Sequence, residues 1–318
     1  SVAAEGSASF AIDEDHNLYY FGNTDIEGLP RKSVPIKIDT DISGVTAGGY
    51  PSIIDTQGNL YYLSDKLFKY NNTDVPKAAE DVESFSNAAY LDGSGTLWRR
   101  PVDLPFTLYD ASTKIDTDVK TFSGDDFILY IKSDGSVWTL RKNFQKGSGS
   151  SWNDGLDLSQ PHKVMDSGKY VNSDLGYFVI KEDSSLWTWT SCYYGTQYEG
   201  MESGGISEPE KIADGVAQVG SANGNYIAYL KTDGSLWVMP DGRLDGLTPL
   251  FDDLTAPVKL LDGVRTFSCA WTHMLIVKND GTLWSWGLNN CGQLGDGTAA
   301  SHQAPVQITD FYETAGQG

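Results

Sequence analysis

Side chains that could do acid–base chemistry or hold a ligand stand just before several recurrent hairpins. If these segments meet at one opening, they bring carboxylates, amides and aromatic rings together. A pair of carboxylates is what glycoside hydrolysis needs, and such a rim could also hold a sugar, a peptide or a cation. The alternative to a functional site is a solvated acidic rim. The candidates for this funnel are Tyr50, Asp125, Asp126, Asp174, Asn223, Asn225 and His273.

Signatures of other active sites are absent. The chain has no Gly-x-Ser-x-Gly, His-Glu-x-x-His or phosphate-loop motif, and its four histidines stand singly. A calcium loop beginning at Asp39 would need a glutamate where Tyr50 stands. Cys192, Cys269 and Cys291 lack metal-ligand spacing, so we interpret them as structural or free thiols. We predict no catalytic residue, no metal and no cofactor.

One hairpin sequence recurs along the chain and must position these groups. In "LKTDGSLWVM" the pair Asp233-Gly234 separates two apolar runs, which predicts a hairpin with a type I′ turn. Near-copies start at Ile131 and Val277, and four weaker copies bring the number of units to seven. The aromatic residue after each turn is Tyr19, Tyr61, Trp98, Trp138, Trp187, Trp237 and Trp284.

Each unit also has an upstream part with a proline, a short apolar strand, an acidic turn and a second strand, as in "PVKLLDGVRTF". Four short strands in about 40 to 50 residues are typical of a β-propeller blade. The last residues repeat the upstream half of a blade and the first residues supply a hairpin. We therefore predict an all-β, closed seven-bladed β-propeller with four-stranded blades, in which the N- and C-terminal segments share one blade. It forms a single domain over residues 1–318.

Charge excludes some partners. The chain has 43 acidic and 23 basic residues, a formal net charge of −20, which repels phosphate backbones and anionic membranes. No apolar run approaches the length of about 18 residues that a membrane span needs. We expect no nucleic acid, no membrane span and a monomeric chain. No signal sequence stands in the given residues.

The last unit contains a His before an apolar strand, an Asp-Gly turn, Trp-x-Trp-Gly, Asn and Gly-Gln-Leu-Gly, from His273 through Asp280, Trp284 and Asn289 to Gly295. With these motifs it resembles the repeat of the regulator of chromosome condensation family. The other units match mainly in the hairpin and the upstream strand. The resemblance implies a seven-bladed propeller that holds protein partners through loops at one face, and a His273 that packs within its blade. The acidic composition is more similar to divergent bacterial members, including secreted ones, than to the chromatin-binding founders.

Three long connections follow the Trp-bearing hairpins of the fourth, fifth and sixth blades. Large aromatic residues in polar, Gly-rich loops are typical of binding surfaces, although such loops can also cap their own blades. We therefore predict a secreted or cell-surface module that binds a protein or other macromolecule, and the alternative is a carbohydrate-active enzyme or lectin that uses the acidic funnel. The predicted partner-binding residues are Phe144, Trp152, Tyr193, Tyr194, Tyr198, Phe251 and Trp271.

Overall fold

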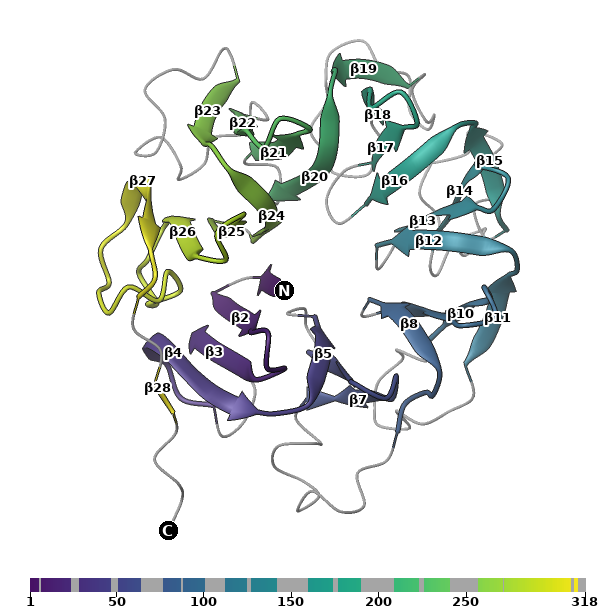
Figure 1. Ribbon diagram of the computed structural model, residues 1–318. Coiled ribbons are helices and arrows are strands. Elements are labelled where there is room, and N and C mark those ends of the chain that lie inside the picture. Colours follow the sequence, from purple (N-terminus) through teal and green to yellow (C-terminus); the bar gives the residue numbers. More distant parts are fainter. Residues whose placement is uncertain are drawn as a thin grey trace, which may run out of the picture. The chain divides into compact units, whose positions relative to one another are not determined.

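The computed structural model of the chain describes most of its β-structure. The described residues are 1–5, 7–23, 29–46, 51–63, 77–86, 88–100, 112–124, 127–141, 160–173, 177–189, 209–222, 226–240, 257–270, 272–309 and 312–313. They form seven sheets of short strands (Figure 1). Two compact units can be distinguished, one made of residues 1–83 and 220–318 and the other of residues 84–219.

The first unit holds four sheets, with strand orders β1-β2-β3-β4-β28, β5-β6-β7, β20-β21-β22-β23 and β24-β25-β26-β27. An isolated bridge between Leu60 and Ala79 adds a fourth segment to the three-stranded sheet. The strands are β1 (Val2–Glu5), β2 (Ala8–Ile12), β3 (Leu18–Gly22), β4 (Lys32–Asp39), β5 (Ile42–Val45), β6 (Ser52–Asp55), β7 (Leu60–Tyr62), β20 (Val216–Ala222), β21 (Tyr226–Lys231), β22 (Leu236–Pro240), β23 (Val258–Leu261), β24 (Val264–Cys269), β25 (His273–Lys278), β26 (Leu283–Gly287), β27 (His302–Gln307) and β28 (Tyr312–Glu313).

The second unit holds three four-stranded sheets, with strand orders β11-β10-β9-β8, β12-β13-β14-β15 and β16-β17-β18-β19. Its strands are β8 (Val82–Phe85), β9 (Ala89–Asp92), β10 (Leu97–Arg99), β11 (Thr113–Asp116), β12 (Val119–Ser123), β13 (Phe127–Lys132), β14 (Val137–Arg141), β15 (His162–Met165), β16 (Gly168–Asn172), β17 (Tyr177–Lys181), β18 (Leu186–Trp189) and β19 (Glu210–Ala213). The predicted all-β chain of seven propeller blades is confirmed.

The predicted type I′ turn is wrong in its detail. Within the Asp233-Gly234 pair, Gly234 has a φ of 83° and Asp233 is not in the positive-φ region. Lys231 N donates to Ser235 O over 2.9 Å, so the loop has three residues and ends in a left-handed glycine. The Asp233 carboxylate accepts hydrogen bonds from the backbone N and the hydroxyl of Ser235 at 2.9 and 2.6 Å. These bonds keep the aspartate in the ordinary backbone region and lower the pKa of its carboxyl.

The aromatic residue after the turn completes the same local network. Trp237 Nε1 donates to Ser235 Oγ over 2.8 Å, and Lys231 Nζ lies 5.0 Å from the centroid of the indole ring. The hairpin of β25 and β26 repeats this arrangement, with Lys278 Nζ 5.3 Å from the ring of Trp284. The most repeated residues of the chain are therefore used in closing hairpins.

Backbone hydrogen bonds join hairpins to the sheet that follows them in the chain. In the first unit Val264 N, which begins β24, donates to Gly234 O over 2.9 Å. In the second unit Gly168 N, which begins β16, donates to Gly135 O over 3.0 Å. Because both bonds use the left-handed turn residue, the turn sets the register between one blade and the next.

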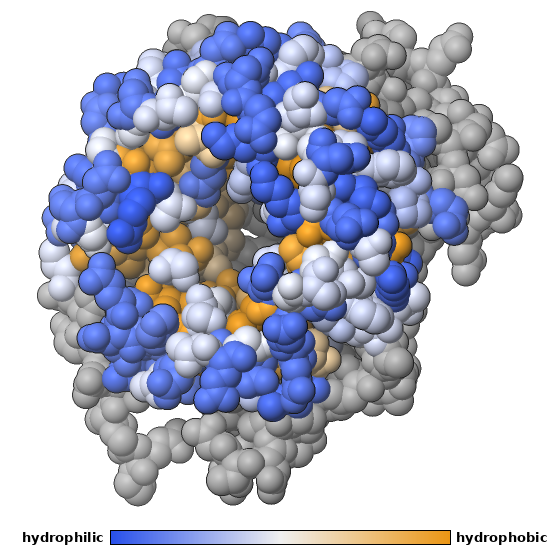
Figure 2. All heavy atoms as spheres, turned by 45° about the vertical axis from the view of Figure 1, so that its right-hand side comes forward, coloured by the Kyte–Doolittle hydropathy of each residue, from blue (hydrophilic) through white to orange (hydrophobic). Residues whose placement is uncertain are grey.

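Apolar side chains fill the space between neighbouring sheets within each unit. Tyr226, Leu236 and Trp286 belong to one cluster that β21, β22 and β24 to β26 share. As predicted, both faces of β21 are buried. Figure 2 shows hydrophilic residues over most of the drawn face, and among the described residues Val258 is the one exposed large apolar side chain. No helix in the described ranges is long and apolar enough to cross a membrane.

The two terminal segments meet in one sheet, as predicted. The N-terminal segment supplies β1 to β4, and β28 lies parallel to β4 at its edge (Figure 1). The detail differs from the repeat-based expectation, because β27 completes the sheet that begins at β24 and β1 is the first strand of its own sheet. The C-terminal segment therefore adds a fifth strand.

Candidate functional site

The loop between β26 and β27 carries the Gly-Gln-Leu-Gly motif and folds against the first blade. Gly297 N donates to Ser33 O of β4 over 2.9 Å. Arg31 also contacts the loop, and its Nη2 and Nε donate to Asn290 O at 2.6 Å and Cys291 O at 3.0 Å. The loop thus connects the last complete sheet to the first sheet.

A buried hydrogen-bond chain lies beneath this loop. Ser9 Oγ of β2 is 2.8 Å from His273 Nε2 of β25 and donates to Gln293 O over 2.9 Å. Tyr226 Oη donates to His273 O over 3.1 Å. The side chains of Ser9, His273 and Gln293 are buried. The hydrogen bonds of Ser9 and Tyr226 therefore join β2 and β21 to β25 at His273, one through its imidazole and the other through its backbone carbonyl.

The arrangement does not activate a nucleophile. Because the Ser9 hydroxyl gives its proton to Gln293 O, it must accept from His273 Nε2, so that nitrogen carries the proton. A general base would need that nitrogen unprotonated. Burial lowers the pKa of His273 to about 3, so the ring is neutral at ordinary pH. The pair is a structural contact that no substrate reaches.

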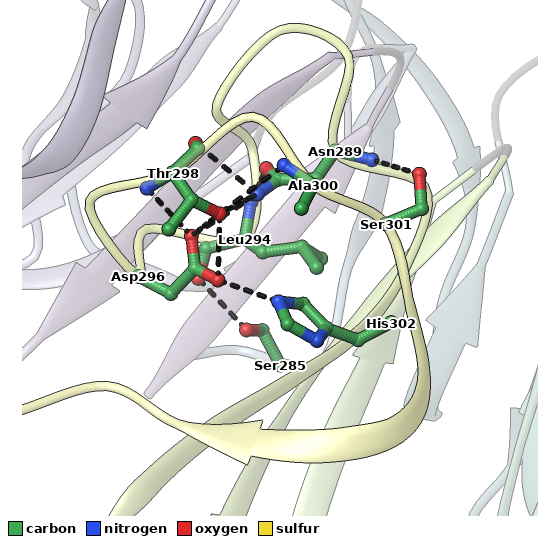
Figure 3. Close-up of polar contacts among 8 residues, drawn as sticks. All are labelled: Ser285, Asn289, Leu294, Asp296, Thr298, Ala300, Ser301 and His302. Carbon is green, nitrogen blue, oxygen red and sulfur yellow. Dashed lines mark hydrogen bonds and ion pairs between the residues drawn. The ribbon is translucent and has the colours of Figure 1, made fainter.

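A second polar cluster holds the outer part of the loop (Figure 3). Asn289 Oδ1 accepts from Leu294 N at 2.9 Å, and its Nδ2 donates to Asp296 Oδ1 at 3.1 Å. Asp296 Oδ2 also pairs with His302 Nε2 at 2.7 Å. Burial favours a raised pKa for Asp296, but hydrogen bonds from Thr298, His302 and Asn289 outweigh it and lower the pKa. The polar groups of the cluster bond to one another, so few hydrogen-bond donors and acceptors remain for a ligand.

Most predicted site residues lie outside the described residues. This holds for all the predicted partner-binding residues and for every funnel candidate except His273. His273 does not line an opening, because its side chain is fully buried between β25 and β2. Within the described part of the chain, Cys269 and Cys291 form no disulfide, and Cys192 lies outside that part. Among the described residues no group of three His, Cys, Asp or Glu side chains could hold a metal ion.

Sequence reasoning missed the residues of the first blade that complete this junction. Ser9 and Arg31 belong to no motif, so no pattern singles them out. Phe21-Gly22 did offer a signal, because it repeats the Trp286-Gly287 pair at the end of the corresponding strand, and both glycines have positive φ, 93° and 118°. In addition to the hairpin, the first blade therefore shares this aromatic-glycine pair with the last complete blade.

Comparison with known proteins bears on the same loop. Two family models of the regulator of chromosome condensation repeat match residues 264–293 and 280–314, which contain β25, the loop and β27. The sheet organisation agrees with solved propellers of that family. The last complete blade of this propeller therefore carries the regulator of chromosome condensation repeat. A relative found by sequence is the human E3 ubiquitin-protein ligase HERC2, 27% identical over 159 residues, which cover 47% of this chain and 3% of HERC2.

Two solved structures show the fold that this repeat propeller shares. The crystal structure of human WBSCR16 has a TM-score of 0.62 and 16% identity, covering 92% of each chain. Yeast RCC1 (Prp20), solved bound to Kap60, has a TM-score of 0.50 and 18% identity, covering 98% of this chain and 74% of that one. In this chain the repeat motif lies where the last complete sheet contacts the first sheet.

Proposed function

We propose that this repeat-family propeller is a non-catalytic module that holds a protein partner through the long connections at one end of its blades. The observation that carries the proposal is the difference between the two ends of a sheet. At one end the hairpins are short and use their polar groups internally, as Asp233, Ser235 and Trp237 do. That end offers little variation for recognising a partner.

The opposite end carries the connections that differ most between blades. They join β14 to β15 over residues 142–161, β18 to β19 over residues 190–209, and β22 to β23 over residues 241–257. Trp152, Tyr193, Tyr194 and Phe251 belong to these connections. Aromatic side chains in polar loops supply large contact area at low cost in conformational entropy.

Two further observations favour binding over catalysis. Ser9 and His273 form a buried pair whose proton arrangement excludes general-base activation. A propeller of the same repeat family, yeast RCC1 (Prp20), was solved with the protein Kap60 bound. A secreted or cell-surface setting is part of the proposal, supported by the acidic composition that keeps exposed proteins soluble.

The proposal can be tested with the immobilised chain. Culture and envelope fractions of the source organism are passed over the intact chain and over a variant whose three long connections are shortened, and retained proteins are quantified by mass spectrometry. We expect a protein that the intact chain retains and the variant does not. Retention of glycan alone, or equal retention by both forms, would overturn the proposal.

A further inference from the structure

The outer edge of the first blade differs from the other outer edges in length. β4 has eight residues, whereas β27 has six and the outer strands β11, β15, β19 and β23 have four each. Folded proteins keep sheet edges short or covered, because a long edge offers unpaired N–H and C=O groups to any extended chain. The β4 edge is therefore the one that most needs cover among these strands.

The chain itself supplies that cover in two places. Near the start of β4, Ser33 O accepts a hydrogen bond from Gly297 N. Further along, β28 pairs with β4 in parallel register, with Tyr312 opposite Ile36 and Glu313 opposite Lys37 (Figure 1). Within the described part of the C-terminal segment, this second pairing involves the two residues of β28. So short a pairing adds little stability, since even a complete two-stranded hairpin is marginal in water.

The two faces of β4 indicate what a strand at this edge must carry. Ile36 and Ile38 pack against the apolar cluster that contains Phe10 and Tyr20. Lys37 alternates with them along the strand and has Tyr19 of β3 as its register partner. Opposite these positions, a strand gains most from an apolar residue followed by an acidic one, because side chains directly across a sheet interact. Tyr312 and Glu313 have this order.

We propose that the outer edge of β4 is a strand-addition site. β28 occupies this site, and an extended peptide with alternating apolar and acidic residues replaces β28 there in parallel register. Main-chain pairing supplies the affinity of such sites, and alternate side chains supply the specificity. This site lies at a sheet edge and is independent of the long connections proposed to hold a protein partner. The weak two-residue pairing makes the resident strand exchangeable.

The test uses the full chain and a variant that releases the resident strand. Replacing Tyr312→Pro and Glu313→Pro together removes both backbone N–H groups of β28, and proline does not fit a paired strand. The probe is a fluorescent peptide of sequence DFYETAGQG, which copies residues 310–318. Its binding is followed by fluorescence anisotropy, and a scrambled peptide is the control.

We expect the peptide to bind the double-proline variant at least tenfold more tightly than the unaltered chain, where the resident strand competes. Lys37→Glu in that variant should weaken binding about tenfold, and a peptide with lysine at the position of Glu313 should recover most of the loss. Urea unfolding of each variant shows that it is folded. If the folded variant binds no peptide, binds the scrambled peptide equally, or shows no charge-swap recovery, the proposal is wrong.

Discussion

Ser9 and His273 are 264 residues apart in the sequence, yet their side chains are joined by a buried hydrogen bond of 2.8 Å between Oγ and Nε2. The bond links the second strand of the first blade to the second strand of the last complete blade. Gln293 of the repeat motif accepts the serine proton through its backbone carbonyl. His273, whose residue type is often catalytic, thus helps to hold the N-terminal and C-terminal parts of the chain together.

The first prediction concerns pH. Burial lowers the pKa of His273 from 6.5 to about 3, so the unfolded state binds a proton first as the pH falls. The free energy of unfolding should therefore decrease from about pH 6.5 down to about pH 3. Between pH 7.5 and 4.5 the loss from this group should be about 2–3 kcal/mol. Urea unfolding of the unaltered chain and of His273→Gln at both pH values measures it, and equal pH dependence in the two proteins would contradict the assignment.

The second prediction compares two glycines with positive φ. A Cβ at Gly287 would meet the carbonyl oxygen of Thr272 and lie 2.8 Å from Cα of His273, whereas a Cβ at Gly281 would meet nothing within 4 Å. Gly287→Ala should lower the free energy of unfolding by about 3 kcal/mol or more, and Gly281→Ala by about 1 kcal/mol. Denaturant titration separates the two. Similar losses would show that backbone strain alone, without close contact, sets the cost.

The third prediction tests the polar cluster of the repeat loop. Asn289 is fully buried and bonds Leu294 N and Asp296, so Asn289→Ala leaves buried groups without partners. The loss in unfolding free energy should be about 2–3 kcal/mol. Asn290→Ala is the matched control, because Asn290 is exposed and its side-chain oxygen accepts a bond from Gln293 Nε2, and it should cost less than about 1 kcal/mol. A reversed order of the two losses would refute this role for Asn289.

The fourth prediction is a stabilising change. Ser184 has a φ of 63° at the position where Gly234 stands in the corresponding hairpin. A left-handed conformation costs a residue with a Cβ about 1–2 kcal/mol, and the bond from Val216 N to its carbonyl uses only the backbone. Ser184→Gly should therefore raise the free energy of unfolding by about 0.5–1 kcal/mol, after the entropic cost of glycine. A lower melting temperature for this variant would mean that a contact of the serine side chain stabilises the protein by more than the left-handed conformation costs.

The sequence predicts much of this fold because the hairpin repeats. Period-two apolar patterns, Asp-Gly turns and the aromatic residue after each turn depend on neighbours in the chain, and these are visible without a structure. Trp138, Trp187, Trp237 and Trp284 accordingly occupy the same second position of β14, β18, β22 and β26. The turn type was mispredicted because the aspartate caps the turn through Ser235, a competing interaction that the Asp-Gly rule ignores.

The junction between the first and last complete blades was not predictable in the same way. Ser9 and Arg31 act through contacts across more than 250 residues, and nothing local distinguishes them from other polar residues. Arg100 is a further example, because its guanidinium is buried at the strand position where Leu140 and Trp286 stand in other sheets. Burial of such a side chain depends on three-dimensional neighbours.

The most direct test of the proposed function is the affinity of the retained partner for matched variants. Trp152, Tyr193 and Tyr194 are replaced together by Ala in one variant, and Lys231 and Lys278 at the hairpin end are replaced by Ala in the other. If the long connections hold the partner, the first variant should lose more than about 2 kcal/mol, about thirtyfold in Kd, and the second less than about twofold. Unchanged affinity in the first variant, with a loss in the second, would contradict the account and place binding at the hairpin end.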